Sequence, residues 1–182
     1  QVVQHDLVTG EERLLFEAGR GALPEGVQVQ TPDFDAATGT LAITLRGARR
    51  ITALVSGDGA LRPVGGGDTC QLGWLPRNLG LCLVGRGGRM RNALLRAPPG
   101  EETPRVWFDM PEPYSHEYFP RTDASGRLLV FGASTGGHEH DSADYEIFVW
   151  PVGTPEEEAV RLTFHSGNDC WPDIRLSIPS GL

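Results

Sequence analysis

The sequence predicts an all-β fold built from repeated four-stranded antiparallel sheets. A strand, turn and strand pattern recurs along the chain, and short β-branched and aromatic runs alternate with turns rich in Gly, Pro, Asp and Asn. No amphipathic helix of useful length interrupts these runs. Because a four-stranded unit cannot bury both of its faces alone, its copies have to pack on one another. The usual solution is a β-propeller, in which each unit is one blade.

The blades are recognised by their second strands, which are short hydrophobic runs after a turn. These runs begin at Leu41, Leu81 and Leu128, at spacings of 40 and 47 residues. Spacings of this size are typical of propeller blades. The remaining strands are predicted at 31–34, 71–74, 119–121 and 171–174 (first), at 50–55, 92–95 and 145–149 (third), and at 61–64, 105–108 and 161–164 (fourth).

The two ends of the chain resemble incomplete blades. Residues 1–7 and 13–16 match the third and fourth strands of a blade, and residues 171–176 match a first strand. We therefore expect one domain over residues 1–182, with partial blades at 1–27 and 168–182 and whole blades at about 28–67, 68–114 and 115–167. Two arrangements remain open. Either the partial pieces combine into a fourth blade and close the ring, or the chain is a segment of a larger ring.

Composition excludes several classes of protein. The 16 basic and 24 acidic residues give a net charge of -8, which argues against a nucleic-acid partner because binding a polyanion needs an excess of positive charge. No apolar run approaches the ~20 residues that a membrane-spanning helix requires. Cys70, Cys82 and Cys170 form no CxxC pair, so the sequence signals neither a disulfide framework nor a structural zinc site. One disulfide and buried free thiols both remain open.

Propeller topology brings three polar loops to one face, namely 112–117, 136–144 and 165–170. Four of the five histidines fall in these loops, together with several carboxylates. Aromatic side chains with flanking polar groups are typical of partner interfaces, and aromatic residues stand beside the starts of the innermost strands. We expect a protein partner here, or alternatively a peptide or glycan. The predicted partner-binding residues are Tyr114, His116, Glu117, Asp169 and Trp171.

A metal is a second interpretation of the same face. His138 and His140 lie two residues apart, so an extended segment would direct both imidazoles to one side, where Asp141 and His165 could complete a site for a divalent metal such as zinc. Calcium would instead prefer the carboxylates, including Asp141 and Asp144. The alternative is an ordinary solvated loop.

Repeat alignment adds an electrostatic expectation. Asp68, Glu117 and Asp169 occupy related positions, so one acid from each of three blades would surround the mouth of the channel. A ring of acids would attract a cation or a basic peptide. Core packing between blades is the competing interpretation for the aromatic residues Tyr114 and Trp171.

The repeat itself resembles a known family. Phe119-Pro120 leads to Gly126-Arg127-Leu128-Leu129-Val130-Phe131, then to Asp144-Tyr145-Glu146-Ile147-Phe148-Val149 and to Arg161-Leu162-Thr163. This order resembles the TolB-type β-propeller repeat, in which a Pro-x-x-Ser-Pro-Asp-Gly-x-x-Ile-x-Phe stretch precedes Glu-Ile-Tyr-Val and Arg-Leu-Thr. The resemblance is strong over residues 118–174, although 122–126 departs from the Ser-Pro-Asp-Gly turn.

The resemblance implies a scaffold that is usually six-bladed, periplasmic or extracellular in many bacterial members, and used to dock proteins or small ligands. We therefore expect a non-catalytic protein-binding or assembly module. The alternative is an accessory domain of a larger enzyme such as a peptidase or kinase, because TolB-type repeats also occur in that setting. The chain contains no Gly-x-Ser-x-Gly, His-Glu-x-x-His or P-loop motif, so catalysis in a parent protein would depend on other residues.

Overall fold

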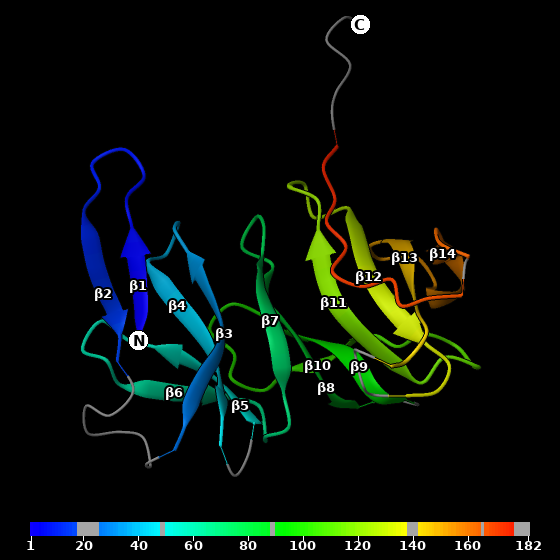
Figure 1. Cartoon of the computed structure of the whole chain (residues 1–182), viewed down its shortest axis with the longest axis horizontal. Helices are drawn as coiled ribbons and strands as arrows, with labels where there is room; N and C mark the ends of the chain where they lie inside the picture. The colour runs from blue at the N-terminus through cyan, green and yellow to red at the C-terminus, as the bar shows by residue number, and fades with distance from the viewer. Residues whose placement is uncertain (18–25, 48–49, 88–89, 138–141, 165, 177–182) are drawn as a thin grey trace, which may run out of the picture.

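The computed structural model describes residues 1–17, 26–47, 50–87, 90–137, 142–164 and 166–176. In this part of the chain the regular structure is all β, apart from one 3-10 turn at Glu156–Glu158. The sheets follow one another in sequence order from β1 and β2 to β14 (Figure 1). The described residues include no helix long and apolar enough to cross a membrane.

The first four-stranded sheet is an antiparallel meander in the order β3-β4-β5-β6. Its second strand is buried along almost its whole length because neighbouring sheets cover both faces, which explains the continuous apolar run after Thr40. The four strands are β3 (Gln28–Asp35), β4 (Thr40–Arg46), β5 (Arg50–Val55) and β6 (Leu61–Val64).

Two further meanders follow, and a single parallel bridge between His116 and Asn92 joins them. Within each meander every strand pairs antiparallel with the next one in sequence. The strands are β7 (Cys70–Leu75), β8 (Gly80–Gly87), β9 (Met90–Ala97) and β10 (Arg105–Phe108), then β11 (His116–Thr122), β12 (Leu128–Ser134), β13 (Tyr145–Pro151) and β14 (Val160–Arg161). Each of the three repeats therefore contains four strands near the predicted positions, although β14 is shorter than expected.

The two ends of the chain do not form a shared sheet in the described residues. β1 (Val2–His5) and β2 (Glu12–Phe16) make a two-stranded sheet of their own. The first strand predicted at 171–174 is wrong, because these residues have no strand assignment. Trp171 has a left-handed backbone with φ of 62°, as Phe119 in β11 also has, so this conformation does not itself prevent a strand; the described residues contain no second strand beside the segment. The described residues therefore do not close into a four-bladed ring.

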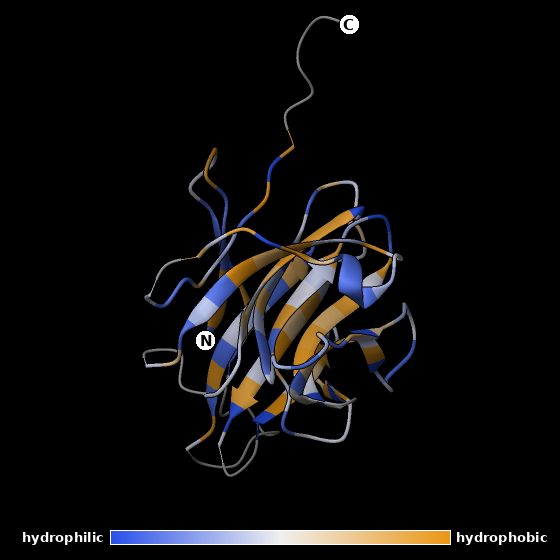
Figure 2. Cartoon of the chain, turned by 90° about the vertical axis from the view of Figure 1, so that its right-hand side faces the viewer, coloured by the Kyte–Doolittle hydropathy of each residue, from blue (hydrophilic) through white to orange (hydrophobic). Residues whose placement is uncertain are grey.

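Successive sheets pack on one another through three apolar clusters. Phe16 of β2 packs with Ile43 of the first meander, Val64 of that meander packs with Leu83 of the second, and Leu94 of the second packs in the cluster of the third. Figure 2 shows apolar residues along the strands and polar residues in many of the loops. Full burial of an aliphatic or aromatic side chain contributes about 1.5–3 kcal/mol, so these contacts hold neighbouring sheets together.

The turn between β11 and β12 depends on Asp123. Its Oδ1 accepts hydrogen bonds from the N–H groups of Arg127 and Leu128, both at 2.8 Å, and its Oδ2 accepts one from the N–H of Ser125 at 2.9 Å. Burial alone would raise the pKa of Asp123, but the bonds from Ser125, Leu128 and Arg127 lower it to about 2. The Asp123 carboxylate therefore stabilises the turn at 122–126, which is the segment where the sequence departs from the Ser-Pro-Asp-Gly turn of the TolB-type repeat.

Candidate binding site between the inner strands

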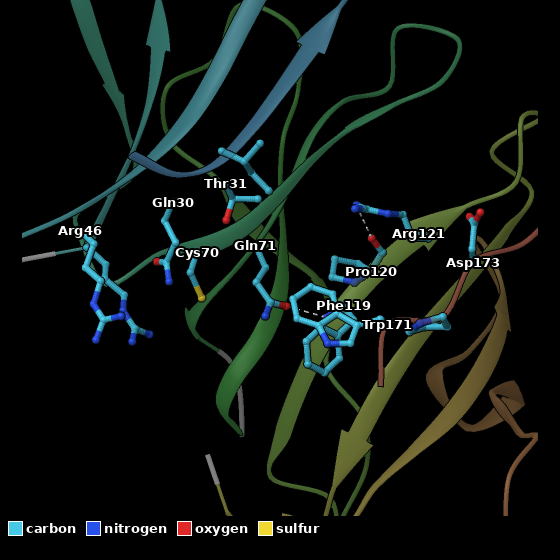
Figure 3. Close-up of a pocket in the computed structure, with 13 residues that line it drawn as sticks. Gln30, Thr31, Arg46, Cys70, Gln71, Phe119, Pro120, Arg121, Trp171 and Asp173 are labelled. Carbon is cyan, nitrogen blue, oxygen red and sulfur yellow. Dashed lines mark hydrogen bonds between the residues drawn. The ribbon is translucent and has the colours of Figure 1, made fainter. Parts of the chain in front are cut away.

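A cavity lies where the first strands of the three meanders meet. It has a volume of about 570 Å³ and is bounded by β3, β7 and β11 and by the segment 171–173 (Figure 3). A second cavity of about 320 Å³ shares Thr31, Leu72, Pro120 and Arg121 with the first, so hollow space continues along the inner strands. Volumes of this size are typical of small-ligand sites.

Two of the inner strands, β7 and β11, and the segment 171–173 share an unusual backbone conformation at the cavity. Gln71, Phe119 and Trp171 all have positive φ, at 46°, 59° and 62°, and all three line the cavity. In β7 and β11 the register shifts around these residues, as a β-bulge produces. A non-glycine residue with positive φ costs roughly 1 kcal/mol or more, so the repeated feature has to be held by surrounding contacts.

Hydrogen bonds between neighbouring repeats supply these contacts. The N–H of Phe119 donates to Oε1 of Gln71 at 2.8 Å. The N–H of Trp74 donates to Oδ2 of Asp33 at 2.6 Å, and the indole Nε1–H of Trp74 donates to the Asp33 carbonyl oxygen at 3.2 Å. The rings of Phe119 and Trp171 lie 4.3 Å apart between centroids. The inner strands are therefore linked by side chains although they form no common ladder.

Gly73 keeps the second cavity open. A Cβ atom at this position would lie 3.2 Å from Nη1 of Arg121 and 3.8 Å from Oδ2 of Asp33. The missing side chain thus leaves room for an arginine and a carboxylate from the two neighbouring repeats.

The cavity carries a positive charge in a chain of net charge -8. Arg46, Arg50 and Arg121 line it, against the single carboxylate of Asp173. This distribution differs from the expected ring of acids and favours an anion over a cation or a basic peptide.

The cavity thiol is not suited to nucleophilic catalysis. Burial raises the pKa of Cys70 to about 11, although the nearby Arg50 guanidinium opposes the rise. Burial likewise raises the pKa of Cys82 to about 12. Because the thiolate is the reactive form, both groups stay unreactive near neutral pH. Cys70, Cys82 and Cys170 form no disulfide with one another in the structure.

Of the predicted partner-binding residues, Trp171 is the one that lines the cavity, and 66% of its surface is exposed. Tyr114 is half-buried, with its ring edge against Phe148 at 5.0 Å between centroids. Asp169 is half-buried, and its N–H donates to the Tyr145 carbonyl oxygen at 2.8 Å. The structure thus places Tyr114 and Asp169 in packing and connecting roles.

His116 and Glu117 are buried residues of β11, which corrects the expectation that they form part of an exposed polar face. Glu117 is fully buried and accepts hydrogen bonds from the N–H groups of Leu94, at 3.1 Å, and Met110. Burial raises the pKa of Glu117 well above its usual range. This carboxyl joins β11 to the preceding meander and does not reach the channel mouth, so the predicted ring of acids is wrong at this position.

The predicted metal ligands His138, His140, Asp141 and His165 lie outside the described residues. Within the described ranges, no group of three or more His, Cys, Asp or Glu side chains is arranged to hold a metal ion. The zinc and calcium alternatives therefore stay predictions.

Sequence reasoning missed the arginines and Gln71 as site residues. A signal was nevertheless present, since Thr31-Pro32, Phe119-Pro120 and Trp171-Pro172 repeat one pattern. That pattern marks the part of each repeat that faces the cavity. No protein-family model matches the chain, and a search of the curated proteins finds no significant match.

Proposed function

We propose that the chain is a sector of a β-propeller and acts as a non-catalytic protein-binding module, docking its partner over Trp171 at the opening of the inner-strand cavity. Consecutive four-stranded meanders that pack through apolar clusters support the propeller arrangement. The resemblance to TolB-type repeats supports the docking role and a periplasmic or extracellular location.

The observation that carries this proposal is the state of Trp171. Two thirds of this large apolar side chain is exposed, yet its ring is held against Phe119 and its backbone takes a left-handed conformation. An aromatic side chain that is exposed and already positioned loses little entropy on binding, and tryptophan is enriched among residues that dominate binding energy. We therefore assign Trp171 as the side chain of this chain that anchors the partner.

Substitution at Trp171 tests the docking role. Wild-type protein and the Trp171→Ala variant are immobilised and exposed to an extract of the source organism, and the retained proteins are quantified by mass spectrometry. The matched control is Phe164→Ala, which removes another strongly exposed aromatic ring, 73% exposed and away from the cavity. We expect a protein that wild type and Phe164→Ala retain and Trp171→Ala loses. Equal retention by wild type and Trp171→Ala would reject this docking site.

A further inference from the structure

We infer that the arginine end of the inner-strand cavity binds the oxyanion, carboxylate or phosphate, of a small organic ligand whose planar ring lies toward Phe119 and Trp171. This site goes beyond the docking of a protein partner, because its ligand fits inside the cavity. The anion itself is held by Arg46 and Arg50, which the docking proposal does not use, whereas the ring of the ligand would share Trp171 with the docked partner.

The two arginines form a cross-strand pair. Arg46 in β4 is the direct register partner of Arg50 in β5, and both side chains line the cavity. Directly opposed residues have Cβ atoms about 4.5–5.5 Å apart, and like charges in that position repel each other. Two guanidinium groups on directly opposed residues can both reach one anion, and each presents forked N–H donors that match the oxygens of a carboxylate or phosphate.

No acidic side chain among the described residues forms an ion pair with Arg46 or Arg50. The one carboxylate that lines the cavity, Asp173, lies at the opposite side from Arg46 (Figure 3). A second cross-strand arginine pair, Arg96 and Arg105, shows the contrast, because Glu101 Oε2 lies 3.5 Å from Nη2 of Arg105. Among the described residues, Arg46 and Arg50 thus have no ion-pair partner like Glu101, and a bound anion would supply a counter-charge.

Neutral donors and aromatic surface extend the site away from the arginines. Gln71 lies between Arg46 and Phe119 in Figure 3. Its Oε1 accepts the Phe119 N–H, which fixes the amide so that Nε2 keeps its two N–H donors for a ligand. Beyond it, Phe119 and Trp171 present aromatic surface against which a planar ring can pack. The arginines, the Gln71 amide and the aromatic surface thus follow one another along the cavity, and this order fits a ligand that carries an oxyanion at one end and a planar ring at the other.

Titration calorimetry with four probes tests the inference: inorganic phosphate, phenyl phosphate, benzoate and the neutral benzyl alcohol. We expect phenyl phosphate or benzoate to bind more tightly than inorganic phosphate and benzyl alcohol, and the preferred acid identifies the oxyanion. Arg46→Gln and Arg50→Gln should each weaken that binding by about tenfold or more, because each removes charge-assisted hydrogen bonds. Arg105→Gln is the matched control and should bind as wild type does.

Three results would overturn the inference: no binding of either ring-bearing acid to wild type at millimolar concentration, equal weakening by Arg105→Gln, or benzyl alcohol binding as tightly as the acids. Thermal unfolding separates a ligand role from a structural one. Since Arg46→Gln relieves a repulsion, its melting temperature without ligand should not fall below that of wild type, and a marked fall would contradict the assignment. Trp171→Ala should still bind inorganic phosphate, because Arg46 and Arg50 remain. The anion test can therefore succeed even if the docking proposal fails.

Discussion

The backbone N–H of Phe119 donates to the side-chain Oε1 of Gln71 across 2.8 Å, so a residue of one inner strand holds the bulge of the next. Both residues have positive φ, and both line the same cavity. The bond therefore joins two neighbouring repeats at their strained residues, and it helps to fix the shape of the candidate site.

Replacing Gln71 with alanine should destabilise the protein by about 1–3 kcal/mol, because the buried Phe119 N–H would lose its acceptor. The free energy of unfolding in urea measures this effect. Gln28→Ala is the control, since Gln28 is exposed in β3 and such substitutions change stability by less than about 0.5 kcal/mol. Equal effects of the two substitutions would show that the Gln71 bond does not support the bulge.

Asp123→Asn should destabilise the protein and make its free energy of unfolding depend less on pH in acid. The pKa of Asp123 is lowered to about 2 in the folded state, so its contribution is fully present above its unfolded value of 3.8 and disappears as the pH falls through about 2. The difference in unfolding free energy between wild type and Asp123→Asn should shrink over this interval. A difference that stays constant between pH 4 and pH 2 would mean that the turn does not depend on the carboxylate charge.

Glu117→Gln should show the opposite dependence on pH. Because burial raises the pKa of Glu117 in the folded protein, the folded state binds more protons than the unfolded state above about pH 4.5. Wild type therefore loses stability relative to Glu117→Gln as the pH rises above that value, until the folded carboxyl has titrated. Chemical unfolding at a series of pH values measures the relative change. A parallel pair of stability curves would contradict the raised pKa.

Arg161→Ala should destabilise the protein more than the loss of an exposed ion pair does, because Glu146 is almost fully buried and Arg161 provides its counter-charge. Glu146 also accepts a hydrogen bond from the Thr163 hydroxyl at 2.6 Å, so the loss would disturb the end of the third meander. Arg62→Ala is the matched control. Its ion pair with Glu102, at 3.2 Å, is about half exposed and should contribute at most about 1 kcal/mol. Thermal unfolding of both variants tests whether the Arg161 substitution is the more destabilising one. Equal falls in melting temperature would refute this expectation.

The strand pattern could be predicted because its causes are local. The strands β6 and β10 coincide with the predicted ranges 61–64 and 105–108, since turn residues and short apolar runs mark the ends of strands independently of distant contacts. The expected strand at 171–174 failed for a tertiary reason. A first strand needs a second strand beside it, and the described residues contain none there.

The candidate site could be predicted only in part. Trp171 was expected as a partner residue and lies at the cavity, whereas Glu117 was expected on the surface and is buried. Glu117 was assigned to the loop 112–117, but β11 already begins at His116, and packing of this strand against the preceding meander buries the carboxyl.

The sequence by itself determined the class of fold and the positions of most strands, because hydrophobic alternation and turn chemistry act within a few residues. Only the tertiary structure decided which side chains meet. Gln71 and Phe119 come from different repeats, and so do Asp33 and Trp74. The site arises where separate sheets pack against one another, and their relative placement depends on burial and bulge geometry that no single repeat specifies.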